Sequence, residues 1–206
     1  MKNLPTARSA LRRSALPLLL TAALALSGCS ALVAQNPGGK LSPVNAVADD
    51  NTPRLMLKGH DVVAYFTQGR HAVGLPQHSV EHEGVSFRFV SAEHRALFVA
   101  DPGRYLPQYG GYCANGMVYG IPWGGDADTW RIVDGRLYIF GGAQSKAGFE
   151  LDLPGNIRLA DHYWTTEAQG SNSFWQRSKR LVFRVPHYKS GEELDRAIAA
   201  RRSTPP

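Results

Sequence analysis

Two pairs of strand-like runs constrain the fold more than any other feature of this sequence. The runs 129–133 and 136–140 are rich in β-branched and aromatic residues and flank an Asp-Gly pair, a dipeptide typical of tight hairpin turns. The runs 78–82 and 85–90 flank a Glu-Gly pair, and the second of them alternates apolar and polar residues. The sequence therefore predicts two antiparallel β-hairpins.

Helical patterns lie between and after these hairpins. Ser91 is a capping residue in front of a short apolar stripe, and Pro102 ends that helix because it disfavours the helical conformation of the residue before it. Further helices are expected at 145–153, 154–164 and 190–202, and the run 181–185 favours a strand. We therefore expect an α+β fold of small antiparallel hairpins with packing helices, followed by a mainly helical C-terminal extension.

The first 28 residues have the pattern of a secretory signal. Basic residues precede an apolar run at 14–26, which is too short for a membrane span of roughly 20 residues. The run ends at Leu26-Ser27-Gly28-Cys29, which resembles the bacterial lipobox, so Cys29 is expected to carry lipid. By resemblance to lipoprotein sorting in Gram-negative bacteria, Ser30 favours the periplasmic face of the outer membrane. The alternative is an ordinary signal peptide that is cut at a nearby small residue.

These patterns divide the chain into four segments. We expect a signal peptide at 1–28, a lipidated N-terminus and flexible tether at 29–53, a folded domain at 54–164 and a C-terminal extension at 165–206. The leader holds four basic and no acidic residues, so much of the net charge of +6 leaves with it. The rest of the chain is nearly balanced, and the dense basic face of a nucleic-acid-binding protein is not expected.

Cys113 lies in the most unusual loop of the sequence. The run Tyr109-Gly110-Gly111-Tyr112-Cys113 combines adjacent glycines, which permit a close approach to the backbone, with two aromatic rings. If Cys29 carries lipid, Cys113 has no disulfide partner in the chain, because there are only two cysteines. One interpretation is an exposed redox thiol in a ligand-binding loop. The other is a buried small apolar residue, which is the usual state of a free cysteine.

Histidine and aspartate side chains supply further candidates. His60 and Asp61 are expected to act as a base or as ligands of a small molecule, whereas the alternative for Asp61 is to cap the next turn. Cys113, His60 and His94 form a candidate site for copper or zinc, with surface histidines as the alternative. Two other histidines that share a face are His78 and His82.

Four motifs, in the right order, resemble those of the exported bacterial branch of the YHS domain family. They are GHDVVAYF at 59–66, FVSAE at 89–93, YLPQYGGYCA at 105–114 and WRIVDGRLY at 130–138. The resemblance implies a small α+β domain that is similar to short cysteine-based heavy-metal-binding modules. It also implies redox interest in the position of Cys113.

The expected function is that of a lipid-anchored cell-envelope module. It binds a small ligand or a metal, or it senses redox state through Cys113. The sequence holds no phosphate-cradling glycine motif and no nucleophile elbow, which favours a non-catalytic protein over an enzyme. Asp126 and Asp128 do not continue as a calcium loop, because Trp130 and Arg131 stand where a ligand and a glycine are needed. The alternative function is an envelope scaffold whose tail from Gln169 binds a protein partner.

Overall fold

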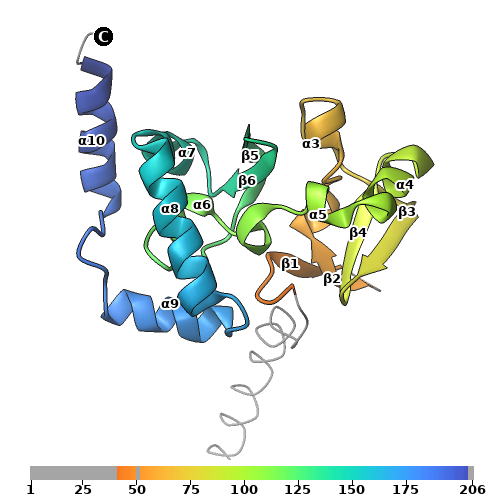
Figure 1. The fold of residues 1–206 in the computed structure, drawn as a ribbon, viewed down its shortest axis with the longest axis horizontal. Coiled ribbons are helices and arrows are strands. Elements are labelled where there is room, and N and C mark those ends of the chain that lie inside the picture. Colours follow the sequence, from red (N-terminus) through yellow and green to blue (C-terminus); the bar gives the residue numbers. More distant parts are fainter. Residues whose placement is uncertain (1–40, 50–51, 204–206) are drawn as a thin grey trace, which may run out of the picture. The chain divides into compact units, whose positions relative to one another are not determined.

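A computed structural model describes residues 41–49 and 52–203 (Figure 1). The expected signal peptide and the lipidation site at Cys29 lie outside the described residues. The described part has the predicted α+β character, with a four-stranded mixed sheet, a separate two-stranded hairpin and a helical C-terminal part. None of its helices is long and apolar enough to cross a bilayer.

The strands of the described part build both expected hairpins. They are β1 (Ala46–Asp49), β2 (Thr52–Met56), β3 (Leu75–His82), β4 (Val85–Phe89), β5 (Asp126–Val133) and β6 (Arg136–Phe140). The four-stranded sheet has the order β1-β2-β4-β3, in which only the β2–β4 pair is parallel. The turn residues Glu83 and Asp134 have φ angles of 50° and 49°, the left-handed conformation that tight hairpin turns require.

The helical segments include the four predicted helices and several that the sequence did not predict, α9 among them. They are η1 (Leu57–Gly59), α3 (Ala64–Thr67), α4 (Ala92–Ala100), α5 (Pro102–Tyr105), η2 (Gln108–Gly111), α6 (Ala114–Met117), α7 (Ala143–Glu150), α8 (Leu153–Tyr163), η3 (Trp164–Ala168), α9 (Ser173–Val182) and α10 (Gly191–Ser203). The expected cap is present, since the Ser91 hydroxyl accepts a hydrogen bond from the His94 backbone N–H at 3.2 Å. The three predicted C-terminal helices correspond to α7, α8 and α10.

Two expectations about secondary structure are wrong. The predicted strand at 181–185 is absent from the described chain, because the helix that Asn172 caps continues through Val182. The predicted tether is not unstructured to its end, because Val44 and Ala46 are buried and β1 pairs with β2. Because most residues of this segment are polar, its sequence does not indicate that a few apolar residues attach it to the core.

Strand β6 joins two apolar cores. Leu137 and Ile139 belong to the core under the four-stranded sheet, together with aromatic residues such as Phe87 and Phe98. Tyr138 and Phe140 point to the opposite face and belong to a second core with α6, α7 and α8. Alternate strand residues face opposite sides, so one short strand supports both cores.

Candidate functional site

The Gly-Gly-Tyr loop is covered by the chain's own N-terminal segment. A Cβ atom at Gly110 would lie 2.3 Å from the Pro43 carbonyl oxygen, and the φ angle of Gly110 is +61°. The Asn45 backbone N–H donates to the Gly110 oxygen at 2.8 Å, and the Tyr112 hydroxyl donates to the Val44 oxygen at 2.9 Å. The glycines at this point therefore admit residues 43–45 rather than an external ligand.

Cys113 is buried, with 2% of its surface exposed. Its backbone N–H donates to the Trp123 oxygen at 2.8 Å, and the residue forms an isolated parallel bridge with Ile139 of β6. Of the two interpretations of this thiol, the structure supports that of a buried small apolar residue. The prediction of an accessible redox centre at Cys113 has no support in its surroundings, because thiol chemistry needs access to the sulfur.

We expect Cys113 to resist alkylation until the protein unfolds. Iodoacetamide should react at least about 10³-fold more slowly with the folded protein than with the unfolded chain, since a stable domain opens globally with at least about 5 kcal/mol. Peptide mapping by mass spectrometry would measure the modification of Cys113 with and without guanidinium. Rapid labelling of the folded protein at neutral pH would show that the sulfur is accessible.

Asp61 is fully buried and connects three segments of the chain. Its Oδ1 accepts from the backbone N–H groups of Val63 at 2.8 Å and Ala64 at 3.2 Å. Its Oδ2 accepts from the Val90 N–H at 2.8 Å and lies 2.6 Å from Nδ1 of His94. The carboxylate thus caps the turn that leads into α3, in agreement with the alternative interpretation, and it also binds the residues at the start of α4.

His94 is held on both of its ring nitrogens. Nδ1 contacts Asp61, and Nε2 lies 3.1 Å from the Thr67 hydroxyl, which also donates to the Val63 carbonyl at 3.2 Å. Carboxylate, imidazole and hydroxyl therefore stand in a row. The carboxylate already accepts hydrogen bonds from backbone donors, and the imidazole is buried. We therefore interpret the Asp61–His94–Thr67 hydrogen bonds as a structural link between α3 and α4.

His60 turns away from its neighbour Asp61 and lines a cavity. Its Nδ1 lies 2.9 Å from the Leu57 carbonyl oxygen, which can only accept, so Nδ1 carries a proton. Nε2 is therefore the ring nitrogen of His60 that is left for other contacts. The ring of His71 lies near that of His60, with 5.7 Å between the centroids.

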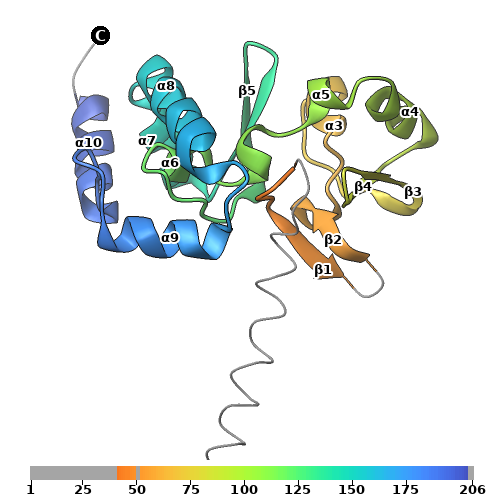
Figure 2. The same cartoon turned by 60° about the horizontal axis from the view of Figure 1, so that its bottom comes forward.

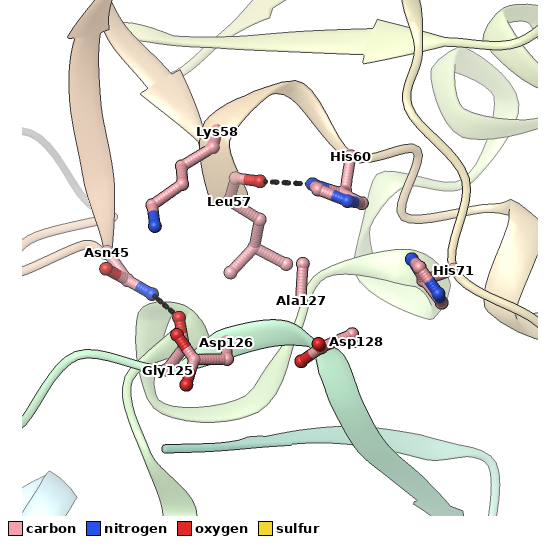
Figure 3. A pocket seen from close by; sticks show the side chains of 9 residues that line it. All are labelled: Asn45, Leu57, Lys58, His60, His71, Gly125, Asp126, Ala127 and Asp128. Atoms are coloured by element: carbon pink, nitrogen blue, oxygen red, sulfur yellow. Dashed lines mark hydrogen bonds between the residues drawn. The ribbon is translucent and has the colours of Figure 1, made fainter. Parts of the chain in front are cut away.

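The cavity beside His60 has a volume of about 240 Å³. Figure 3 shows Lys58 and His60 on one side of it and Asp126 and Asp128 on the other. We call it the His60 cavity, and its lining residues are Asn45, Leu57, Lys58, His60, His71, Gly125, Asp126, Ala127 and Asp128. An ammonium group, two imidazoles and two carboxylates thus meet in one small space.

The wall of this cavity contains an unusual backbone turn. Leu57, Lys58 and Gly59 have φ angles of 46°, 55° and 83°, so three consecutive residues are left-handed. A non-glycine residue in this conformation costs roughly 1–2 kcal/mol, and such strain clusters at binding sites and active sites. Hydrogen bonds to the Leu57 oxygen from the N–H and ring of His60 hold the turn in place.

Asn45 connects the Gly-Gly-Tyr loop to the cavity. Its Nδ2 donates to the Gly111 oxygen at 3.0 Å and to the Gly125 oxygen at 2.9 Å. Gly125 lies so close to the loop that a Cβ atom there would stand 2.7 Å from the Gly111 oxygen. The Gly-Gly-Tyr loop therefore supports one wall of the cavity.

The structure does not bring the three candidate metal ligands together. Within residues 41–49 and 52–203, no group of three or more His, Cys, Asp or Glu side chains is placed to hold a metal ion. The three candidate ligands have separate surroundings. Cys113 lies in a buried turn, His60 lines the His60 cavity, and His94 is hydrogen-bonded to the buried Asp61. A copper or zinc site needs its donors within one coordination sphere.

The remaining predicted ligand residues belong to the packing of the loop. The Tyr109 hydroxyl donates to Asp161 at 2.8 Å, and burial, followed by this hydrogen bond, raises the pKa of Tyr109. Burial also raises the pKa of Tyr112. Arg136 donates to both oxygens of the same Asp161 carboxylate, which ties the loop to β6 and α8.

Sequence reasoning found His60 but missed the side chains that share its cavity. Lys58, His71, Asp126 and Asp128 come from three separate segments. One signal was available, because Asp126 and Asp128 alternate along a strand-like run and must therefore share a face. Their failure to match a calcium loop did not exclude a ligand of another kind.

Comparison of the chain with protein-family models, with curated proteins and with solved structures finds no match.

Proposed function

We propose that this protein is a lipid-anchored cell-envelope module with a YHS-like domain, and that it binds a small zwitterionic molecule in the His60 cavity. The resemblance of four sequence motifs supports the family, the lipobox at Cys29 supports the anchor, and Ser30 supports the periplasmic face of the outer membrane. The observation that carries the binding function is the set of charged side chains that meets in the cavity.

The charges of the cavity favour a ligand with both a cationic and an anionic group. Lys58 has no ion-pair partner among the described residues, and the same holds for Asp126 and for Asp128. A ligand ammonium would be bound by the two carboxylates, and a ligand carboxylate by Lys58. Because Nδ1 of His60 donates to the Leu57 oxygen, Nε2 of the neutral ring is an acceptor and would accept a hydrogen bond from the ligand ammonium. Hydrogen bonds between charged groups are the strongest polar contacts that such a site can offer.

The size of the cavity limits the ligand to that of an amino acid. Sites for drug-sized ligands have volumes of roughly 300–1,000 Å³, whereas the His60 cavity has about 240 Å³. Because Cys113 is buried behind the wall that Gly111 and Gly125 form, the proposed function does not involve its thiol. The Gly-Gly-Tyr loop instead holds this wall of the His60 cavity in position.

Binding of free α-amino acids to the full-length protein tests this function. In calorimetric titrations with glycine, L-glutamate and L-arginine, at least one is expected to bind saturably. His60→Gln and Asp126→Asn should each weaken that binding about 10- to 100-fold, which corresponds to roughly 1.5–3 kcal/mol for a charge-assisted hydrogen bond.

Two substitutions outside the cavity serve as matched controls. His78→Gln and Asp195→Asn change the same residue types on β3 and α10 and should leave the affinity unchanged. The proposal fails if no amino acid binds, or if the cavity variants bind as tightly as these controls.

A further inference from the structure

Helix α9 presents its apolar side to solvent and its polar side to the protein. We call the exposed apolar residues the α9 face, and they are Phe174 (39% exposed), Trp175 (69%), Leu181 (52%), Val182 (73%) and Phe183 (69%). The side that faces the protein includes Ser173 and Gln176, which are 0% and 5% exposed. A helix on the surface of a soluble domain normally has the opposite arrangement.

Polar contacts fix α9 in this orientation. The Gln176 amide donates to the Gly120 oxygen at 2.9 Å and to Glu167 at 3.1 Å, and Lys179 and Arg180 also donate to the Glu167 carboxylate. Burial alone would raise the pKa of Glu167, but these three hydrogen bonds outweigh it and lower the pKa. The apolar residues are therefore exposed because the other side of the helix is firmly bound.

The α9 face is continuous and has basic neighbours. Phe174 and Leu181 lie seven residues apart, as do Trp175 and Val182, so both pairs share one side of the helix. Lys179 is about half exposed, and Arg184, which follows the helix, is exposed over the ring of Tyr188. Aromatic and aliphatic side chains beside lysine and arginine are typical of helices that lie in the interface of an anionic bilayer.

The chain from the proposed lipid anchor enters the described structure beside this helix. The Gly170 N–H donates to the Ser42 oxygen at 2.8 Å, and Asn172, two residues later, caps α9. Only residues 30–40 separate Cys29 from the described chain, which gives a reach of about 40 Å at roughly 3.5 Å per residue. A membrane that held Cys29 would therefore lie within reach of α9.

In Figure 1 and Figure 2, α9 lies along one edge of the described residues, and α7, α8 and α10 are on the same side of it. The exposure of its side chains places the α9 face on the solvent side of this helix.

We propose that the α9 face is a second membrane contact, which inserts into the headgroup region of the bilayer that holds the lipid on Cys29. This inference rests on the proposed anchor for the identity of the membrane, but it does not depend on the His60 cavity. The bound membrane would restrict the domain to one orientation, with Trp175 in the interface.

Fluorescence quenching by brominated lipids tests the contact in the full-length protein, reconstituted into vesicles of phosphatidylethanolamine and phosphatidylglycerol. The wild-type tryptophan emission is expected to be quenched, and Trp175→Phe should remove most of the quenched component. The double variant Leu181→Ser/Phe183→Ser should lose most of the quenching, whereas Leu75→Ser/Val99→Ser, which changes exposed apolar residues on β3 and α4, should retain it.

Two results would overturn the proposal. The first is an absence of quenching at Trp175 in protein whose lipid on Cys29 has been verified by mass spectrometry. The second is self-association in sedimentation experiments that Leu181→Ser/Phe183→Ser abolishes, with no quenching by lipid, because the α9 face would then bind a second copy of the chain. A chain without lipid on Cys29 that still shows quenching at Trp175 supports the contact and rejects only the anchor.

Discussion

Replacing Asp61 by alanine is expected to lower the free energy of unfolding by about 3–5 kcal/mol, because each buried donor that is left without an acceptor costs roughly 1–3 kcal/mol. The variant loses the acceptor for three backbone N–H groups, and it leaves the ring of His94 without its partner in a buried site. Small domains have a total stability of about 5–15 kcal/mol, so this one change would remove a large part of it.

Urea denaturation followed by tryptophan fluorescence measures this effect. Asp195→Ala, which removes an exposed aspartate on α10, should change the free energy of unfolding by less than about 0.5 kcal/mol. Asp61→Asn should fall between the two, because the amide keeps one acceptor oxygen but places an NH₂ group beside a backbone donor. A loss below about 1 kcal/mol in Asp61→Ala would show that the carboxylate does not hold α3 and α4 together.

Replacing Gly110 by alanine is expected to destabilise the protein by at least about 2–4 kcal/mol, since two costs add. The left-handed backbone contributes the first, because φ is +61°. The new Cβ atom contributes the second, because it would lie 2.3 Å from the Pro43 oxygen. Residues 43–45 would have to move away from the loop, and the contact of Asn45 with Gly125 in the cavity wall would be lost with them.

Gly69→Ala is a matched control for this variant. Gly69 has nearly the same φ angle, +62°, but a Cβ atom there would meet no other atom within 4 Å. Its expected loss is therefore the backbone cost of about 1–2 kcal/mol alone. Equal losses of unfolding free energy for the two variants would contradict the close contact between Gly110 and residues 43–45.

Local chemistry in the sequence was sufficient to predict most of the elements. The Asp-Gly and Glu-Gly turns, the alternation in β4 and the Ser91 cap each depend on neighbouring residues, and both hairpins and α4 are confirmed. The run 181–185 was predicted wrongly for a similar reason. Its β-branched and aromatic residues favour a strand locally, but the helix that begins at Asn172 extends through Val182.

The candidate site could not be predicted in full, because it depends on contacts between distant segments. Nothing in the dipeptide His60-Asp61 shows that one side chain lines a cavity and the other is buried against His94. The role of Asn45 could not be predicted either, because this residue lies in a polar segment that was expected to be a flexible tether. In the structure its side chain bridges Gly111 and Gly125. Contacts of this kind require the tertiary fold.

The most direct test of the binding function is nuclear magnetic resonance of the histidine side chains during titration with the amino acid that binds most tightly. We expect saturable changes in the imidazole signals of His60 and His71, which line the cavity. The signals of His78, His82 and His94 should not move, because these residues lie outside it. Saturable binding that leaves His60 and His71 unaffected, or no saturable change at any histidine, would contradict the proposal that the His60 cavity is the ligand site.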